Sequence, residues 1–248
     1  MRILNFFIKL FKFIIHITNT KKIILDIGKF DVCANNVQAE KIRLWFEKIL
    51  KIVNIKTKIN GKVKKGNYLI ISNHSSWLDI IILGSIFKTT FLSKIEVSRW
   101  PIIGMITTAV DMLFIDRGTK NAATQAVDGI SKFISHNRNV TIFPEGTSSG
   151  GKNLLKFKPR LFASCIDINC PVQCVTIKYP HKNKKINPYV PFIRENSLFL
   201  SIIKILFQEK IDAEIIISEL VYTKNKDRKK IANECYEIIK KNLENDIN

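Results

Sequence analysis

The sequence has few of the residue patterns that metal and redox sites require. Its 5 cysteines include no Cys-x-x-Cys pair, and none of its 4 histidines stands at metal-ligand spacing. The Gly-x-Gly-x-x-Gly fingerprint of dinucleotide-binding folds is also absent. We therefore expect no metal and no bound cofactor, and we expect the cysteines to be reduced core residues of an intracellular protein.

Long uninterrupted apolar runs are missing as well. Residues 1–17 are apolar, but Lys9 and Lys12 break them into stretches shorter than the roughly 20 residues that span a bilayer. No Ala-x-Ala-like cleavage site follows, so a signal peptide fits poorly. We predict an amphipathic helix lying in a membrane interface, within a membrane-associating segment of residues 1–36; the alternative is a helix packed on the domain core. The side expected to be buried in the membrane comprises Phe6, Phe7, Leu10, Phe11, Phe13 and Ile14.

Acidic residues are scarce, because 21 of them stand against 40 basic residues and leave a formal net charge of +19. This charge favours an anionic partner, which is nucleic acid, anionic lipid or a phosphorylated substrate. A coding bias toward Lys, Ile and Asn is an alternative explanation for much of it. The lysines are scattered and no helix-turn-helix, zinc-finger or RNP-like motif occurs, so we expect an anionic membrane surface as partner and no nucleic acid.

Apolar runs that alternate with helical patterns indicate an α/β fold. We predict one layered domain over residues 37–248, with a mixed sheet flanked by helices; its 46% apolar composition (of the whole chain) suits a sizeable core. Strands are expected at 53–59, 68–71, 90–92, 111–115, 139–143, 172–179 and 213–218. Helices are expected at 37–53, from 79 onward, and at 94–108, 119–136, 158–169 and 225–244.

The most informative stretch begins where the strand at 68–71 ends. Asn73 and His74 follow this strand, and Asp79 stands at the start of the next apolar, helix-like run. A strand-to-helix turn can fold the carboxylate of Asp79 back onto the imidazole of His74. Because a carboxylate that holds an imidazole in one tautomer makes it a general base, these two residues are the predicted catalytic pair.

Polar residues also follow three later strands. In open α/β sheets such strand ends gather in a common crevice. Each pair alone is more often a surface ion pair or a turn, but their order along the chain indicates one site. The pairs are Asp116 with Arg117, Glu145 with Thr147, and Lys178 with Tyr179.

Four blocks in this order resemble the glycerolipid acyltransferases of the 1-acylglycerol-3-phosphate acyltransferase type. The family's Asn-His-x-x-x-x-Asp hallmark matches residues 73–79, and its Phe-Ile/Val-Asp-Arg block matches 114–117. Its Phe-Pro-Glu-Gly-Thr block matches 143–147 in full, and its Pro-led apolar strand matches 171–175 loosely. The resemblance covers roughly residues 45–180, and the three ordered motifs make it specific.

The resemblance implies transfer of a fatty acyl group from coenzyme A or acyl carrier protein, as co-substrate, to the hydroxyl of a lysolipid. The leading acceptor is lysophosphatidate, giving phosphatidate in phospholipid biosynthesis. We expect a peripheral protein on the cytoplasmic face of a bacterial inner membrane. In this interpretation His74 is the base and Asp79 orients it. The acceptor-binding residues implied are Arg117 for a phosphate or other anionic group, Glu145 for glycerol-type hydroxyls, Gly146 and Thr147.

One position departs from the family pattern. Many members place Arg directly after Phe-Pro-Glu-Gly-Thr, where it is thought to help hold a phosphate, whereas this chain has Ser148. Together with residues 97–101 and 157–162, the Thr-Ser-x-Gly form resembles a bacterial branch that includes enzymes acylating lyso-ornithine lipid. Lyso-ornithine lipid is therefore the alternative acceptor.

A serine hydrolase is the remote alternative. Residues 146–150 satisfy Gly-x-Ser-x-Gly, the nucleophile elbow, with Ser148 at its centre and Asp167 and His181 following in hydrolase order. However, Asp167 lies only 19 positions beyond Ser148, in a helix-like segment where a strand is expected. The hydrolase interpretation also leaves residues 73–79 without a role.

Overall fold

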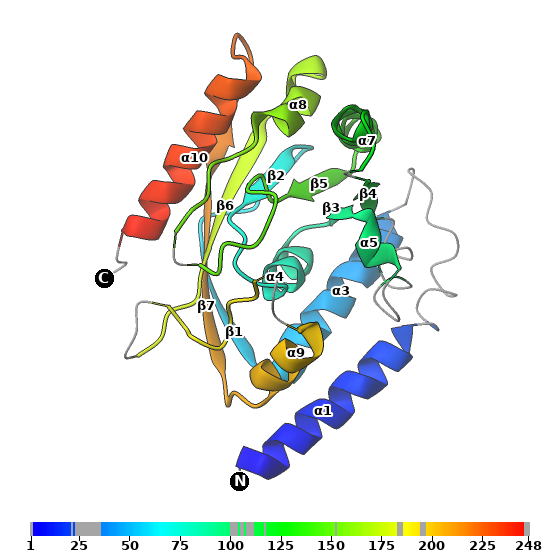
Figure 1. Ribbon diagram of the computed structural model, residues 1–248, viewed down its shortest axis with the longest axis vertical. Coiled ribbons are helices and arrows are strands. Elements are labelled where there is room, and N and C mark those ends of the chain that lie inside the picture. The colour runs from blue at the N-terminus through cyan, green and yellow to red at the C-terminus, as the bar shows by residue number, and fades with distance from the viewer. Residues whose placement is uncertain are drawn as a thin grey trace.

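The fold is built on one seven-stranded mixed sheet with the strand order β1-β7-β6-β2-β5-β3-β4 (Figure 1). Neighbouring strands are parallel except for β6 and β7, which are antiparallel. The strands are β1 (Ile55–Asn60), β2 (Leu69–Ser72), β3 (Thr89–Lys94), β4 (Leu113–Ile115), β5 (Asn139–Ile142), β6 (Val172–Lys178) and β7 (Ile211–Val221). The computed structural model describes residues 2–20, 22, 36–99, 104, 107, 112–116, 118–151, 153–182, 186–193 and 197–245.

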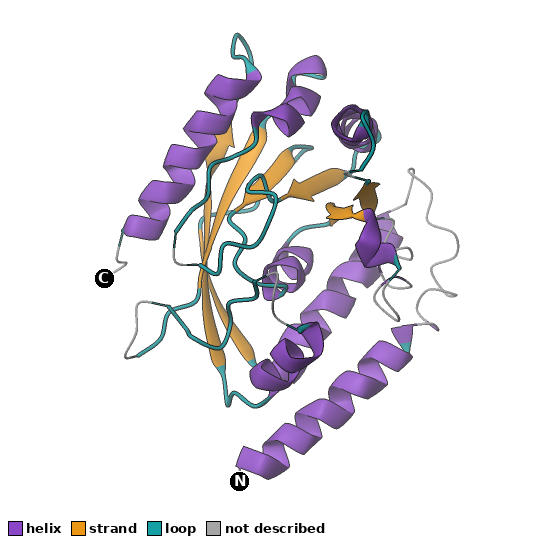
Figure 2. Cartoon of the chain, in the orientation of Figure 1, coloured by secondary structure: helices purple, strands orange, loops and turns teal. Residues whose placement is uncertain are grey.

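Helices cover both faces of the sheet (Figure 2). On one face lie α7 (Ala122–Ser135), the 3₁₀ helix η1 (Pro159–Phe162), α8 (Ala163–Asp167) and α10 (Arg228–Glu244). On the other lie α3 (Asn36–Val53) and α4 (Leu78–Ile86), with α1 (Arg2–Thr18) and α9 (Leu198–Leu206) outside them; the short α5 (Ile95–Ser98) follows β3. This layering explains why β2 is buried along its whole length and apolar in its first three residues, since both of its faces meet helices.

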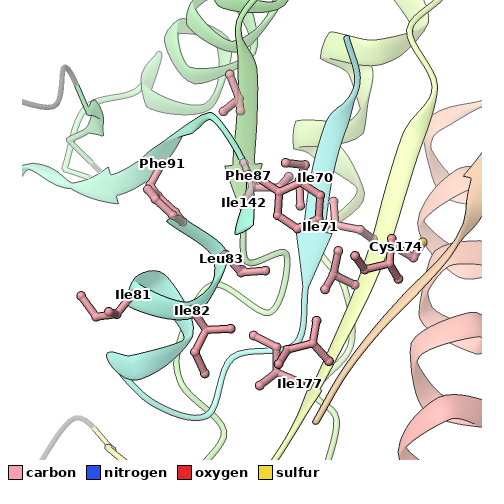
Figure 3. Close-up of a cluster of buried hydrophobic side chains, with 14 of the residues drawn as sticks. Ile70, Ile71, Ile81, Ile82, Leu83, Phe87, Phe91, Ile142, Cys174 and Ile177 are labelled. Carbon is pink, nitrogen blue, oxygen red and sulfur yellow. The ribbon is translucent and has the colours of Figure 1, made fainter. Parts of the chain in front are cut away.

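The core lies between β2 and these helices. Figure 3 shows Ile70 and Ile71 of β2 in one cluster with Ile82 and Leu83 of α4, and all four are fully buried. Burying each such side chain contributes about 1.5–3 kcal/mol. The helix α4 also approaches α3 closely: a Cβ atom added at Gly84 would lie 2.4 Å from the ring of Phe46. Tight packing here holds the first turn of α4 against the sheet.

The N-terminal helix forms as predicted, but half of its expected lipid-facing side contacts protein. Phe6, Leu10 and Phe13 pack against the core together with Ile17, at the spacing of one helix face. The expectation that these three phenylalanine and leucine side chains face a membrane is therefore wrong. The other expected residues remain exposed, namely Phe7, Phe11 and Ile14. Among the described residues, no helix is both long and apolar enough to cross a bilayer.

A buried lysine explains which side of α1 faces the domain. The Lys9 ammonium donates hydrogen bonds to the carbonyl oxygens of Val53 at 2.9 Å, Gln208 at 2.7 Å and Glu209 at 3.1 Å. These carbonyls lie at the C-terminus of α3 and just beyond α9, where helix ends leave acceptors unpaired. Burial lowers the pKa of Lys9, and the nearby charge of Glu209 opposes that shift. Lys9 thus joins α1, α3 and α9.

Lys9→Ala should therefore loosen α1. Removing the ammonium leaves three carbonyl oxygens without their donor, and a hydrogen bond from a charged group contributes about 1.5–3 kcal/mol. We expect the free energy of unfolding to fall by about 2 kcal/mol in urea denaturation. Lys12→Ala, at an exposed position of the same helix, is the matched control and should change it little. Equal losses in both variants would contradict the anchoring role.

The remaining elements follow the predictions with three differences. The strand expected at 213–218 is longer at both ends, and the helix expected at 158–169 divides into η1 and α8. The helix α9 was not predicted. Most of the helix expected at 94–108 lies outside the described residues. Four cysteines, Cys165, Cys170, Cys174 and Cys235, are buried free thiols as predicted, and Cys33 lies outside the described residues.

Candidate active site

The loop between β2 and α4 brings His74 and Asp79 together. The Nδ1 atom of His74 lies 2.9 Å from Oδ2 of Asp79, which is fully buried. The same Oδ2 accepts hydrogen bonds from the backbone N–H groups of Ser75 at 2.7 Å and Ser76 at 2.8 Å. Asp79 lies in the first turn of α4, where the helix dipole favours a negative charge. The predicted contact between these two side chains is therefore present.

The second oxygen of Asp79 is held by a tyrosine from another strand. The Tyr179 hydroxyl, just beyond β6, donates to Oδ1 of Asp79 at 2.6 Å. Burial raises the pKa of Tyr179, and the charge of Asp79 raises it further, so this hydroxyl keeps its proton at neutral pH. With both oxygens bonded, the Asp79 carboxylate has a defined orientation toward His74.

Asn73 determines where the chain leaves the sheet. Its side-chain amide donates to the carbonyl oxygen of Ile177 at 2.9 Å and accepts from the Ile177 N–H at 2.9 Å. The amide thus continues the pairing of β2 with β6 for one more step beyond Ser72, although the backbone has begun to turn. Asn73 positions the residue that follows it.

The imidazole of His74 packs against an aromatic ring and remains partly exposed. Its ring stacks on Phe143, with centroids 4.0 Å apart and planes inclined by 19°. The side chain retains 19% of its exposure. Because an ionised Asp79 holds the proton on Nδ1, Nε2 has the free lone pair that a general base requires.

Glu145 clamps the backbone around this histidine. One carboxylate oxygen accepts from the His74 N–H at 2.7 Å, and the other accepts from the Leu155 N–H at 2.9 Å. Glu145 is only 3% exposed. Burial raises its pKa to about 6, while the two backbone hydrogen bonds oppose that rise. These contacts make Glu145 a positioning group, and its predicted bond to an acceptor hydroxyl stays a prediction.

The raised pKa of Glu145 predicts a pH dependence of stability. The protonated carboxyl is favoured in the folded state, so this contribution is complete below pH 4.5 and is lost as pH rises through about 6. We expect the free energy of unfolding, relative to Glu145→Gln, to fall by about 2 kcal/mol between pH 4.5 and 7. Urea denaturation at both pH values measures it. A difference that is constant with pH would contradict the buried, raised-pKa carboxyl.

Gly146 and Thr147 continue from Glu145 into a loop beside His74. Gly146 has φ +76°, and a Cβ atom there would lie 2.7 Å from Nζ of Lys158, so the position requires glycine. Thr147 is exposed. The Ser149 N–H donates to the carbonyl oxygen of His74 at 2.8 Å, which holds this loop beside the His74–Asp79 dyad. The structure thus brings Glu145, Gly146 and Thr147 to the same edge of the sheet as His74.

Arg117 lies outside the described residues, and its predicted role stays a prediction. Its neighbour Asp116 follows β4 and accepts a hydrogen bond from the Gly118 N–H at 3.0 Å. Because β4 is parallel to β3 and β5, this strand also ends at the edge that bears His74.

The geometry around Ser148 differs from a nucleophile elbow. That motif places the serine on a sharp turn from a strand directly into a helix. Here β5 ends at Ile142, and among the described residues the next helical one after Ser148 is Pro159. Asp167 ends α8 and leads into the beginning of β6, whereas Ser148 follows the end of the parallel strand β5. Asp167 and Ser148 thus lie toward opposite edges of the sheet, which disfavours a hydrolase triad.

Comparison with known proteins gives the same assignment as the motifs. The family model described as Acyltransferase matches residues 52–178, the part of the chain that contains the His74–Asp79 pair. The chain belongs to the acyltransferase family. The predictions of an acyltransferase and of its family are therefore confirmed.

Relatives of this acyltransferase act on two kinds of lysolipid by name. The lyso-ornithine lipid O-acyltransferase of Pseudomonas aeruginosa is 29% identical over 198 residues, which cover 80% of this chain and 76% of that protein. The 1-acyl-sn-glycerol-3-phosphate acyltransferase of Neisseria gonorrhoeae is 32% identical over 111 residues, which cover 45% of this chain and 44% of that protein.

A solved structure supports the fold along almost the whole chain. The acyltransferase PlsC from Thermotoga maritima superposes with a TM-score of 0.74, covering 98% of this chain and 97% of its own, at 17% identity. The predicted mixed α/β sheet flanked by helices is confirmed.

Sequence reasoning found the dyad but missed two of its supports. The sequence places Tyr179 at a strand end without predicting its bond to Asp79, and the family resemblance places Glu145 at the acceptor. The signal for Tyr179 was its place directly after β6, since residues that follow parallel strands converge at one edge. No local pattern indicates that Glu145 accepts from Leu155, because that contact depends on how the loop folds back.

Proposed function

We propose that this acyltransferase transfers a fatty acyl group from acyl-coenzyme A or acyl carrier protein to the hydroxyl of a lysolipid. The observation that supports it is the 2.9 Å contact between His74 and a buried Asp79, with the His74 side chain left partly exposed. Acyl transfer needs one base for the attacking hydroxyl, and this pair supplies it.

In the proposed mechanism, Nε2 of His74 takes the hydroxyl proton while the lipid oxygen attacks the thioester carbonyl carbon. Asp79 stabilises the imidazolium that results. The tetrahedral intermediate then collapses: the carbon–sulfur bond breaks, and the thiolate leaves and recovers the proton from the imidazolium. No acyl-enzyme forms, because the lipid oxygen is itself the nucleophile.

The oxyanion of the intermediate requires N–H donors near His74. The N–H groups of Ser75 and Ser76 are already bonded to Asp79, and those of Gly146 and Ser149 to carbonyl oxygens. In the loop from 147 to 150, the remaining candidate donors are the backbone N–H groups of Thr147, Ser148 and Gly150.

A cation near the loop supports an anionic acceptor. The exposed Lys158 places its ammonium beside Gly146, and its backbone N–H donates to the carbonyl oxygen of Pro144 at 2.9 Å. A phosphate or carboxylate bound there would be held near His74. We propose lysophosphatidate as the leading acceptor, with Arg117 and Lys158 as its cationic contacts and Glu145, Gly146 and Thr147 shaping the site.

Lyso-ornithine lipid is the second candidate. It is favoured by Ser148, which replaces the arginine frequent in the family, and by the named activity of the Pseudomonas relative. Its carboxylate could occupy the same cationic site.

We further propose that residues 1–36 attach the enzyme to the cytoplasmic face of a bacterial inner membrane. The exposed side of α1 carries Phe7, Phe11 and Ile14. Residues 1–36 contain 6 Lys and Arg residues against 2 Asp residues, a net positive charge that suits anionic lipid.

The test is acyl transfer by the purified protein over a panel of lysolipids, with each donor in turn. We expect product with lysophosphatidate, and a raised KM in Lys158→Met but not in Lys156→Met, whose exposed lysine is two positions away. Activity on non-phosphorylated lysolipids alone would replace lysophosphatidate by the second candidate. Absence of transfer to any lysolipid would overturn the proposal.

A further inference from the structure

The short helix α9 exposes large apolar side chains that its packing does not use. Phe199 is 69% exposed and Leu200 is 55% exposed, and Phe207, one residue beyond the helix, is 47% exposed. Ser201 and Ile205, one helical turn apart, are buried, as is Leu206 at the C-terminal end of the helix. The helix thus exposes large apolar side chains in addition to those that it buries.

The exposed residues of α9 lie on a helix that packs beside α1. The two helices are in contact (Figure 1), and the rings of Phe6 and Phe207 lie with centroids 5.3 Å apart. Lys9 also reaches from α1 to the carbonyl oxygens just after α9. Phe7 and Phe11 of α1 and Phe199 of α9 thus belong to two elements held in one rigid arrangement.

The surface formed by α1 and α9 lies at the edge of the sheet that contains the dyad. The segment from Tyr179 to α9 leaves the end of β6, and α9 leads into the beginning of the antiparallel strand β7. The Nε1 atom of Trp77, three residues after His74, donates to Oγ of Ser201 on α9 at 3.0 Å. A helix that meets a membrane there is bonded directly to the catalytic loop.

A further exposed apolar residue lies beside the loop of residues 146–150, next to His74. Ile193 is exposed, and its side chain would lie 3.1 Å from a Cβ atom added at Gly150. An exposed apolar side chain thus lies beside Gly150 in the loop that follows Glu145.

The charges on these two helices identify the kind of surface that they meet. Neither α1 nor α9 contains an aspartate or a glutamate, and their exposed charged residues are Arg2, Lys12 and Lys204. A second copy of the chain would present the same positive charges to this face and repel it. An anionic bilayer complements both the apolar and the basic residues.

We propose that α9 is a second membrane-contacting element, which together with α1 docks the catalytic edge of the sheet onto an anionic lipid surface. This inference rests on the proposed membrane attachment and adds a helix to it. Phe199 and Leu200 enter the lipid interface, and the Trp77–Ser201 hydrogen bond holds the His74 loop at the depth where a lysolipid hydroxyl lies.

The test compares two double variants of the full-length enzyme. Phe199→Ser with Leu200→Ser removes the α9 contact. Val63→Ser with Tyr222→Ser alters two exposed apolar residues that follow β1 and β7, at the opposite edge of the sheet. Binding to vesicles of phosphatidylcholine and phosphatidylglycerol is measured by flotation. We expect the α9 variant to bind at least about tenfold more weakly and the control to bind as the wild type does.

Activity supplies the second measurement. With lysophosphatidate embedded in the same vesicles, the α9 variant should lose rate in proportion to its lost binding. With a short-chain lysophosphatidate dissolved as monomers, its kcat should equal that of the wild type, since the dyad is intact. Loss of rate on the dissolved acceptor would show a damaged site and contradict the docking role.

The outcomes separate this inference from the proposed attachment. Equal vesicle binding by wild type and α9 variant overturns the role of α9 and leaves the role of α1 standing. A wild type that binds no vesicles overturns both. A wild-type dimer in sedimentation that the α9 variant loses, with vesicle binding unchanged, identifies a second copy as the occupant and also overturns the inference.

Discussion

His74→Ala should lower kcat/KM for acyl transfer by about 10²–10⁴-fold, the usual contribution of a general base. The substitution removes Nε2, the only atom in the proposed mechanism that takes the hydroxyl proton. The fold should survive, because the ring is partly exposed and the backbone clamp from Glu145 to the His74 N–H remains.

The matched control is His136→Ala. His136 is an exposed histidine at the end of α7 whose Nδ1 lies 2.8 Å from the Lys132 carbonyl oxygen. Its replacement should leave kcat/KM unchanged. Circular dichroism of both variants tests whether they are folded. A folded His74→Ala protein with wild-type activity would show that His74 is not the general base.

Asp79→Asn should cost nearly as much, about 10²–10⁴-fold in kcat, because the amide stabilises the wrong tautomer of His74 and no longer balances an imidazolium. The substitution would also destabilise the buried site, because the new amide NH₂ would face donors: the Asp79 oxygens accept from Ser75, Ser76 and Tyr179. A loss of stability therefore accompanies the loss of activity, and a second variant is needed to separate the two.

Tyr179→Phe provides that separation. It keeps the carboxylate and the core volume and removes only the 2.6 Å hydrogen bond to Oδ1. A hydrogen bond to a charged group contributes about 1.5–3 kcal/mol, so we expect kcat to fall by about tenfold or more with KM unchanged. Loss confined to KM would assign Tyr179 to substrate binding and not to orienting Asp79.

Much of the active site was predictable because its residues lie close together in the sequence. A short buried strand delivers His74 to the edge of the sheet, and the next helix begins close enough for Asp79 to return to it. Both elements are short apolar runs bounded by polar residues, a pattern that is visible in the local sequence. The block around Glu145 was found for the same reason, since it follows the neighbouring parallel strand β5.

The features that were missed depend on contacts between distant segments. Lys9 determines which side of α1 faces the domain, and its hydrogen-bond acceptors lie far along the chain at Val53 and Gln208. The helix α9 is short and mostly apolar, and such a run is typical of a buried strand as well as of a helix. The bonds of Glu145 to two backbone N–H groups likewise appear only after the loops have folded.

The central claim is that His74 activates the lipid hydroxyl for direct attack, without an acyl-enzyme at Ser148. The most direct measurement is the intact mass of the wild-type protein after incubation with the acyl thioester and no acceptor, followed by addition of lysophosphatidate. The account predicts an unmodified protein mass in the first step and acylated lipid in the second. A protein mass increased by one acyl group, mapped to Ser148 and lost when the lysolipid is added, would contradict it.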